Sequence, residues 1–288
     1  LISKYVNISR ILSEKRLDKQ SLNMIEKAKV LSEKYNRFEN IITLTFLKKN
    51  ICFVNDSITR SDLETHYNEL FKNIKKLKTK VEYAKIRDEL LFQRKQTGPA
   101  KNIEELQLLN MFNANSYFRD FSHIDSQDAN IFYLLAKLEY YRIIRNGRKA
   151  RIYCLKLISI FDEHPHGVVD YMNLFIYILN VFIVERLYKT KSEAEKTLNK
   201  IITLPSIIGQ KAVKNDIEVK IFEVYSTCIT DIALNLREYE QVLPYIPEIE
   251  SGVKKFEHTI SPSFKLIARS NVACVYFGAR RYKDSLKW

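Results

Sequence analysis

The sequence predicts an all-α protein built from successive pairs of antiparallel helices. Apolar residues recur at steps of three and four over long stretches, which places them on one face of a helix. No segment alternates apolar and polar residues between turn dipeptides, so we expect no strand. The breaks between the helical stretches are short, and short connections place consecutive helices side by side in opposite directions.

Composition agrees with this fold class. The chain has 288 residues, of which 46% are hydrophobic, with Gly 6 and Pro 6. So few glycines and prolines exclude a collagen-like, linker-rich or many-turned all-β chain, because those structures need such residues at their corners. The hydrophobic fraction is enough to bury a core, which excludes disorder. We expect one continuous domain over residues 1–288, and the missing initiator methionine and the unfinished helical pattern at Trp288 suggest a fragment of a longer protein.

The first clear helix begins at Ser61 and runs beyond Ala84. Ser61 and Glu64 have the spacing of a capping box, in which each side chain accepts a hydrogen bond from the other residue's backbone. The break Thr97-Gly98-Pro99 ends the pattern. The predicted core face of this helix consists of Leu63, Tyr67, Leu70, Ile74, Leu77, Val81 and Ala84.

Further helices follow with their own start signals. Asn102 is a predicted N-cap, Ser192 and Glu195 form a second capping box, and Pro262 after Ser261 suits the first turn of a helix. The predicted ranges are 103–117, 129–144, 148–161, 168–188, 194–203, 216–236, 239–254 and 262–278.

An internal repeat indicates how the helices are arranged. In residues 271–288, an apolar residue, a small residue and a tyrosine lie on a first helix, and a tyrosine and a small residue lie on a second. The small residues let the two helices approach, and the aromatic rings fill the groove beside them. The residues are Val272, Ala273, Tyr276, Tyr282 and Ser285, and their order and spacing resemble the tetratricopeptide repeat (TPR) family. The resemblance implies a right-handed αα-hairpin solenoid, TPR-like with irregular long helices.

Two weaker copies lie upstream. In residues 216–254, Tyr239 takes the role of Tyr282. In residues 129–162, Tyr141 and Ala150 keep the spacing between tyrosine and small residue, and Gly147 replaces the second aromatic residue. A fourth trace lies at residues 35–41. The clearest repeats are therefore 129–162, 216–254 and 262–288.

The resemblance implies a function. TPR proteins act as adaptors, and their partners contact the first helix of each repeat in a concave groove. We therefore expect a non-enzymatic, intracellular scaffold that binds a protein or peptide, with an acidic partner matching the positive charge of the chain. Carried over to the matching positions, the resemblance implies a groove lined by Glu139, Arg142, Thr227, Asp231, Asn235, Ser270 and Cys274.

Charge allows an alternative. The chain has Lys+Arg 47 and Asp+Glu 34, a formal net charge of +13, which suits phosphate groups but also fits the compositional bias of an AT-rich genome. Basic residues concentrate on the helix from Ser61 and around the turn near residue 146, where they could equally form solvated faces. An RNA- or DNA-binding solenoid would use Lys72, Lys76, Lys80, Arg145, Arg148 and Arg151. A third hypothesis is the sensing half of a larger regulator.

Chemistry at a catalytic, metal or cofactor site has no support in the sequence. No phosphate-binding loop, nucleophile elbow or common zinc motif occurs, so we expect no enzyme activity, no cofactor and no metal. The cluster of Asp162, Glu163, His164 and His166 around Pro165 is more typical of a turn between helices.

Cysteines and hydropathy indicate the compartment. Cys52, Cys154, Cys228 and Cys274 are far apart and lack the spacing of a redox or zinc motif, which favours free thiols in the reducing cytoplasm. The longest apolar run, residues 174–184, is interrupted by Asn180 and is too short to cross a bilayer, so we expect no membrane insertion.

Overall fold

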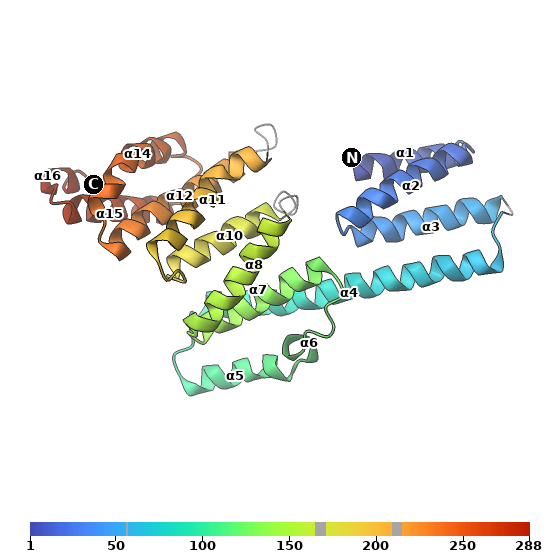
Figure 1. Cartoon of the computed structure of the whole chain (residues 1–288), viewed down its shortest axis with the longest axis horizontal. Helices are drawn as coiled ribbons and strands as arrows, with labels where there is room; N and C mark the ends of the chain where they lie inside the picture. Colours follow the sequence, from blue (N-terminus) through green and yellow to red (C-terminus); the bar gives the residue numbers. More distant parts are fainter. Residues whose placement is uncertain (56, 165–170, 209–214) are drawn as a thin grey trace. The chain divides into compact units, whose positions relative to one another are not determined.

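The computed structural model describes residues 1–55, 57–164, 171–208 and 215–288. These residues form two compact units, residues 1–145 and residues 146–288, and each is described by itself (Figure 1). Over the described ranges the secondary structure is helical and contains no strand, which confirms the predicted all-α class.

Unit 1 begins with three helices that the sequence did not predict individually. They are α1 (Ile2–Glu14), α2 (Asp18–Lys34) and α3 (Phe38–Val54), and each contacts both of the others. Their shared core contains Val6, Ile25, Ala28, Leu44 and Ile51, all buried.

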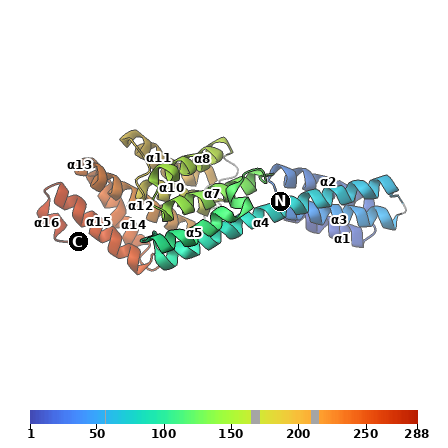
Figure 2. The same ribbon diagram turned by 90° about the horizontal axis from the view of Figure 1, so that it is seen from below.

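Helix α4 (Arg60–Thr97) is the longest element of unit 1. Near its start it contacts α3, and farther along it contacts α7 (Gln127–Ile143), as Figures 1 and 2 both show. Its cap differs from the prediction. The Thr59 hydroxyl accepts a hydrogen bond from the Asp62 backbone N–H (3.1 Å), and the Asp62 carboxylate accepts one from the Thr59 N–H (2.9 Å). The predicted capping box at Ser61 is therefore wrong by two residues, because Thr59 and Asp62 offer the same chemistry one half-turn earlier.

The buried face of α4 also differs from the predicted stripe. Tyr67, Ile74 and Val81 are exposed. These three residues are spaced seven apart. In a straight helix, side chains at this spacing rotate by about 20° around the axis with each heptad, so they do not stay on one face. The buried residues of α4 are Leu70, Asn73, Thr79, Tyr83, Ile86 and Leu90.

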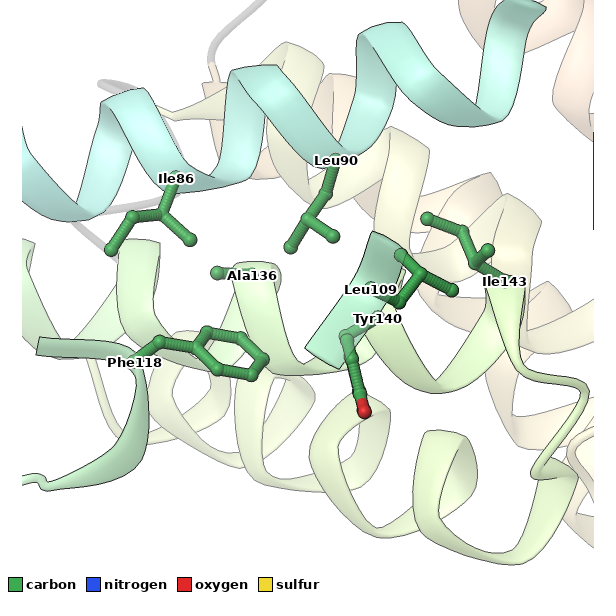
Figure 3. Packing of buried hydrophobic residues seen from close by; sticks show 7 residues of the cluster. All are labelled: Ile86, Leu90, Leu109, Phe118, Ala136, Tyr140 and Ile143. Carbon is green, nitrogen blue, oxygen red and sulfur yellow. The ribbon is translucent and has the colours of Figure 1, made fainter. Parts of the chain in front are cut away.

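The second half of α4 forms a core with α5 (Ile103–Ala114), α6 (Ser116–Arg119) and α7 (Figure 3). Asn102 caps α5 as predicted, accepting a hydrogen bond from the Glu105 N–H (2.8 Å). The predicted helix 103–117 is divided, because Asn115 caps a new helix by accepting from the Tyr117 N–H (2.9 Å). The core residues are Ile86, Leu90, Leu109, Phe118, Ala136, Tyr140 and Ile143.

Unit 2 contains α8 (Gly147–Glu163), α10 (Met172–Val184), α11 (Lys191–Ile208) and α12 (Asn215–Leu236). It continues with α13 (Tyr239–Val242), the 3₁₀ turn η1 (Leu243–Tyr245), α14 (Ile246–Lys255), α15 (Pro262–Gly278) and α16 (Tyr282–Ser285). Helix α12 contacts α10 on one side and α15 on the other, so α10, α12 and α15 are successive neighbours.

Several predicted boundaries in unit 2 change. The predicted helix 239–254 is divided at η1, where Pro244 lacks the N–H that a continuous helix would use. Helix α11 begins earlier than predicted, because Thr190 rather than Ser192 caps it by accepting from the Glu193 N–H (3.3 Å). Residues 168–170 of the predicted helix 168–188 lie outside the described residues. The cap at Ser261 is confirmed, since its hydroxyl accepts from the Phe264 N–H (3.1 Å).

One backbone turn recurs through both units. Six residues that follow helix ends have positive φ between 51° and 59°, and five of them are arginine. At Arg280 the turn is closed by two hydrogen bonds, from Arg280 N–H to the Phe277 carbonyl (3.0 Å) and from Arg281 N–H to the Tyr276 carbonyl (2.8 Å). This is the Schellman arrangement, which satisfies the last carbonyls of a helix. The residues are Arg16, Asn36, Arg145, Arg186, Arg237 and Arg280.

Two glycines lie inside helices of unit 2 and touch aromatic rings. A Cβ atom on Gly278 would lie 2.4 Å from Tyr239 Cε1, and a Cβ atom on Gly252 would lie 2.0 Å from Phe222 Cε2. Both distances are far below van der Waals contact, so only glycine fits these positions without movement of the ring.

The turns predict a measurable gain in stability. A left-handed conformation costs a side-chain-bearing residue about 1 kcal/mol, which glycine avoids. We expect Arg16→Gly to raise the free energy of unfolding by about 0.5 kcal/mol, measured by urea denaturation. Arg10→Gly, at an exposed position inside the preceding helix α1, should lower the free energy of unfolding by about 1 kcal/mol. Equal losses in the two variants would show that the Arg16 backbone carries no strain.

Candidate functional site

The seven predicted groove residues lie in both units. Glu139 and Arg142 belong to α7 in unit 1. Thr227, Asp231 and Asn235 belong to α12, and Ser270 and Cys274 belong to α15, both in unit 2. The two groups differ in burial and in their interactions, so they are considered in turn.

Glu139 and Arg142 form part of the core of unit 1. Glu139 is fully buried, and one of its carboxylate oxygens lies 2.9 Å from a guanidinium nitrogen of Arg142. The other oxygen lies 3.0 Å from a guanidinium nitrogen of Arg94 on α4. The carboxylate thus links α4 to α7, where the sequence predicts a groove surface. A partner could reach it only by breaking these ion pairs.

The α12 residues share one face of their helix. Thr227, Asp231 and Asn235 follow at steps of four and are half-buried. The Asn235 amide donates a hydrogen bond to the Tyr188 hydroxyl (3.4 Å), and the Thr227 hydroxyl donates to the Glu223 carbonyl (2.8 Å). We call Glu223, Thr227, Asp231 and Asn235 the polar line of α12.

Two carboxylates of the polar line have raised pKa values. Burial raises the pKa of Asp231 to about 6, against the attraction of the nearby Arg186 guanidinium, which lowers it. Burial also raises the pKa of Glu223, which Lys220 opposes. Incomplete solvation thus disfavours the charged form of both carboxylates in the line.

Ser270 and Cys274 lie on the exposed face of α15. Exposed apolar side chains surround them, with Leu266 at 71% and Phe277 at 64% exposure. The Asn271 amide donates a hydrogen bond to the Thr230 hydroxyl (3.1 Å), which joins α15 to α12. Asp231 and Ser270 are sequence neighbours of these two bonded residues. Unit 2 therefore carries a polar line on α12 and, on the contacting helix α15, an exposed strip that consists of Leu266, Ser270, Cys274 and Phe277.

The three lysines predicted to bind nucleic acid do not act alike. Lys72 and Lys76 line a hollow of about 560 Å³ between α2, α3 and α4, which we call the lysine hollow. Its lining also includes Lys29 and Glu69, whose charged groups lie 2.5 Å apart. Lys80 lies outside it, with its ammonium 2.8 Å from the Asp128 carboxylate and 3.7 Å from that of Glu39. Lys80 is therefore neutralised within the protein.

The second predicted basic group is also divided. Arg145 ends unit 1, and Arg148 and Arg151 line a hollow of about 570 Å³ in unit 2, which we call the arginine hollow. Arg186 and Lys189, which the sequence did not single out, line the same hollow. Arg186 has a local signal, because it follows the apolar run of α10 at the end of a helix, where cations are favoured. Lys189, three residues later, has none.

Comparison with known proteins assigns no family or function to this chain. No protein family, curated protein or solved structure matches this chain. Within the described ranges, no group of three His, Cys, Asp or Glu side chains could hold a metal ion. Pro165 and His166 of the sequence cluster lie outside those ranges. None of the described helices combines the length and apolar character that a membrane crossing requires.

The buried ion pairs predict a large loss on neutralising Glu139. Glu139→Gln removes the charge that compensates Arg142, whose side chain is only 5% exposed. We expect the free energy of unfolding to fall by about 3 kcal/mol in urea denaturation. Glu64→Gln, which removes the exposed partner of Arg60, should change it by less than about 0.5 kcal/mol. Similar small effects in both variants would refute a structural role for Glu139.

The raised pKa of Asp231 predicts a pH-dependent gain in Asp231→Asn. Below about pH 4 the group is protonated in both the folded and unfolded states, so the substitution should change stability little. Above pH 6 the wild-type carboxylate is charged in both states and poorly solvated when folded. The variant should therefore be more stable by on the order of 1 kcal/mol at pH 7.5, measured by thermal unfolding.

Asp284→Asn is the matched control for this pH test. The hydrogen bond from Lys287 lowers the pKa of the exposed Asp284, so its carboxylate stabilises the fold at neutral pH. Asp284→Asn should therefore lower the stability at neutral pH, and this loss should disappear as the pH falls and the wild-type carboxyl becomes protonated. The same sign in both variants would contradict the assigned environment of Asp231.

Proposed function

We propose that this chain is a non-catalytic, intracellular scaffold, TPR-like in architecture, that binds a peptide or helix along α12 and α15. The observation that carries the proposal is that α12, which bears the polar line, contacts α15, which bears the exposed strip. Polar groups that are only partly satisfied, beside large exposed apolar side chains, suit a surface that a partner covers.

The repeated turns support the solenoid architecture. In unit 2, the first helices α10, α12 and α15 are successive neighbours, and each ends in a turn with a left-handed arginine. Each turn is followed by a second helix, so the same helix-turn-helix arrangement recurs three times. Stacked units of this kind present their first helices on one surface, which is where the proposed partner lies.

Charge and cysteines support an acidic partner and a reducing compartment. The turn residues Arg186, Arg237, Arg280 and Arg281 are exposed, so they would attract an acidic segment and raise its association rate. The four cysteines are free, and Cys274 lies exposed on the proposed surface. An exposed free thiol in the binding face suits a reducing compartment.

The experiment selects random peptides displayed on phage against this chain and measures the affinity of the winners by fluorescence anisotropy. We expect Asn235→Arg and Ser270→Arg each to weaken binding at least about tenfold, because a long charged side chain would occupy the surface. Lys4→Glu, at an exposed position of α1, should leave affinity within about twofold. Circular dichroism of each variant verifies that it is folded.

Two results would count against the proposal. Peptides that bind all variants equally would place the site elsewhere. The other result is binding of mixed-sequence RNA that is stronger at about 50 than at 200 mM salt and that Lys72→Glu and Lys76→Glu abolish. This result would favour nucleic-acid binding at the lysine hollow instead.

A further inference from the structure

The arginine hollow gathers positive charge from three parts of unit 2. Arg148 and Arg151 project from α8, Arg186 lies in the turn after α10, and Lys189 follows it before α11. Against these four cations the lining contains a single carboxylate, that of Glu185. Neither Arg148, Arg186 nor Lys189 has a described carboxylate within 4.0 Å of its charged group.

One arginine of the hollow is held in place from outside it. A guanidinium nitrogen of Arg151 lies 2.6 Å from a carboxylate oxygen of Glu193. The other Glu193 oxygen accepts a hydrogen bond from the Lys189 backbone N–H (2.7 Å), so Glu193 fixes both residues together. The Nε atom of Arg151 is buried and has no hydrogen-bond partner among the described residues. The hollow therefore contains a pair of cationic residues whose positions are fixed before a ligand arrives.

Backbone donors lie at the same place. Asn146 caps α8 by accepting from the Lys149 N–H (3.0 Å), while Gly147 and Arg148 begin the helix. The positive end of the helix dipole therefore faces this part of the hollow. No atom lies within 4 Å of the position of a Cβ on Gly147, so the backbone is open to an approaching group.

We propose that the arginine hollow binds one phosphate-type dianion presented by a peptide. Arginine forks bind phosphate oxygens in pairs, and four cations around one hollow suit a single doubly charged group. A nucleic-acid strand would instead need cations spaced along a track, one for each phosphate. The dianion site stands by itself, and only its presentation by a peptide rests on the proposed function.

A hydrogen bond connects the hollow to the polar line of α12. Tyr188 lines the hollow, and its hydroxyl accepts the bond from Asn235. Arg186 is the cation that acts on the Asp231 carboxylate. A peptide along α12 would therefore bring a phosphorylated side chain to Arg186 and Arg148 without leaving the surface of unit 2.

The test uses isothermal titration calorimetry of the whole chain with three probes at about 50 mM salt. These are inorganic phosphate and a capped pentapeptide of glycine and alanine with one central serine, either phosphorylated or not. Phosphate should bind, the phosphorylated peptide should bind at least about tenfold more tightly, and the unphosphorylated peptide should bind at least about tenfold more weakly than the phosphorylated one.

Matched variants locate the site. Arg148→Gln combined with Arg186→Gln should weaken phosphate binding at least about tenfold. Arg10→Gln combined with Arg16→Gln removes the same charge from one helix position and one left-handed turn outside the hollow, both exposed in unit 1, and should change it by less than about twofold. Equal losses in the two double variants, or no phosphate binding at all, would overturn the proposal.

A third variant separates this proposal from the scaffold function. Asn235→Arg should remove the advantage of the phosphorylated peptide and leave inorganic phosphate bound. Phosphate binding with no advantage for the peptide would overturn the peptide part and keep the dianion site. Phosphate binding that persists while no displayed peptide is ever selected would refute the scaffold function alone.

Discussion

The left-handed turn is the constraint on which the helical arrangement depends. At Arg16 and Asn36 in unit 1, and at Arg186, Arg237 and Arg280 in unit 2, one residue reverses the chain between two helices. The hydrogen bonds of each turn satisfy the helix end internally. The next helix therefore begins only two residues after the turn residue in four cases, and five residues after it at Arg186. Arginine is an uncommon choice for this backbone, and its charge offsets part of the cost because the negative end of the helix dipole lies beside it.

Part of the positive charge of the chain is neutralised or covered by contacts within the protein. Arg142 neutralises Glu139, Lys80 neutralises Asp128, and the ammonium of the buried Lys137 lies 3.7 Å from the centre of the Phe118 ring. The formal net charge of +13 therefore includes cationic side chains that are not available at the surface. The surplus that a partner could meet includes both the exposed turn arginines, such as Arg186 and Arg280, and exposed lysines along the helices, such as Lys75 and Lys78 of α4.

Local signals explain which helices could be predicted. The ranges 216–236 and 262–278 agree with α12 and α15 within one residue, because periodicity and, at Ser261, a cap mark them. Helix α3 has apolar residues on all sides and was not predicted, since periodicity is silent for such a helix. The core face of α4 was misjudged because one half of the helix packs on α3 and the other on α7.

The candidate site depends more on long-range packing. The resemblance to the TPR family implied a groove position for Glu139, but its position opposite Arg94, 45 residues away, is a property of the α4–α7 contact. Arg148 and Arg186 share a hollow because α8 packs against α10, which no local pattern reveals. Thr227, Asp231 and Asn235 could be grouped correctly, since a helix alone brings every fourth residue to one face.

The two glycines that touch aromatic rings have a consequence for the binding surface. The Tyr239 ring contacts the backbone of Gly278 directly, so no side-chain atoms lie between the ring and the helix that could rearrange to accommodate a larger residue. A bulkier residue there would displace either the Tyr239 ring or α15 itself, and a displaced α15 would carry Ser270 and Cys274 with it. Under the proposed function, a substitution at Gly278 would therefore alter selectivity by moving the proposed binding face of α15, without adding a contact to the partner.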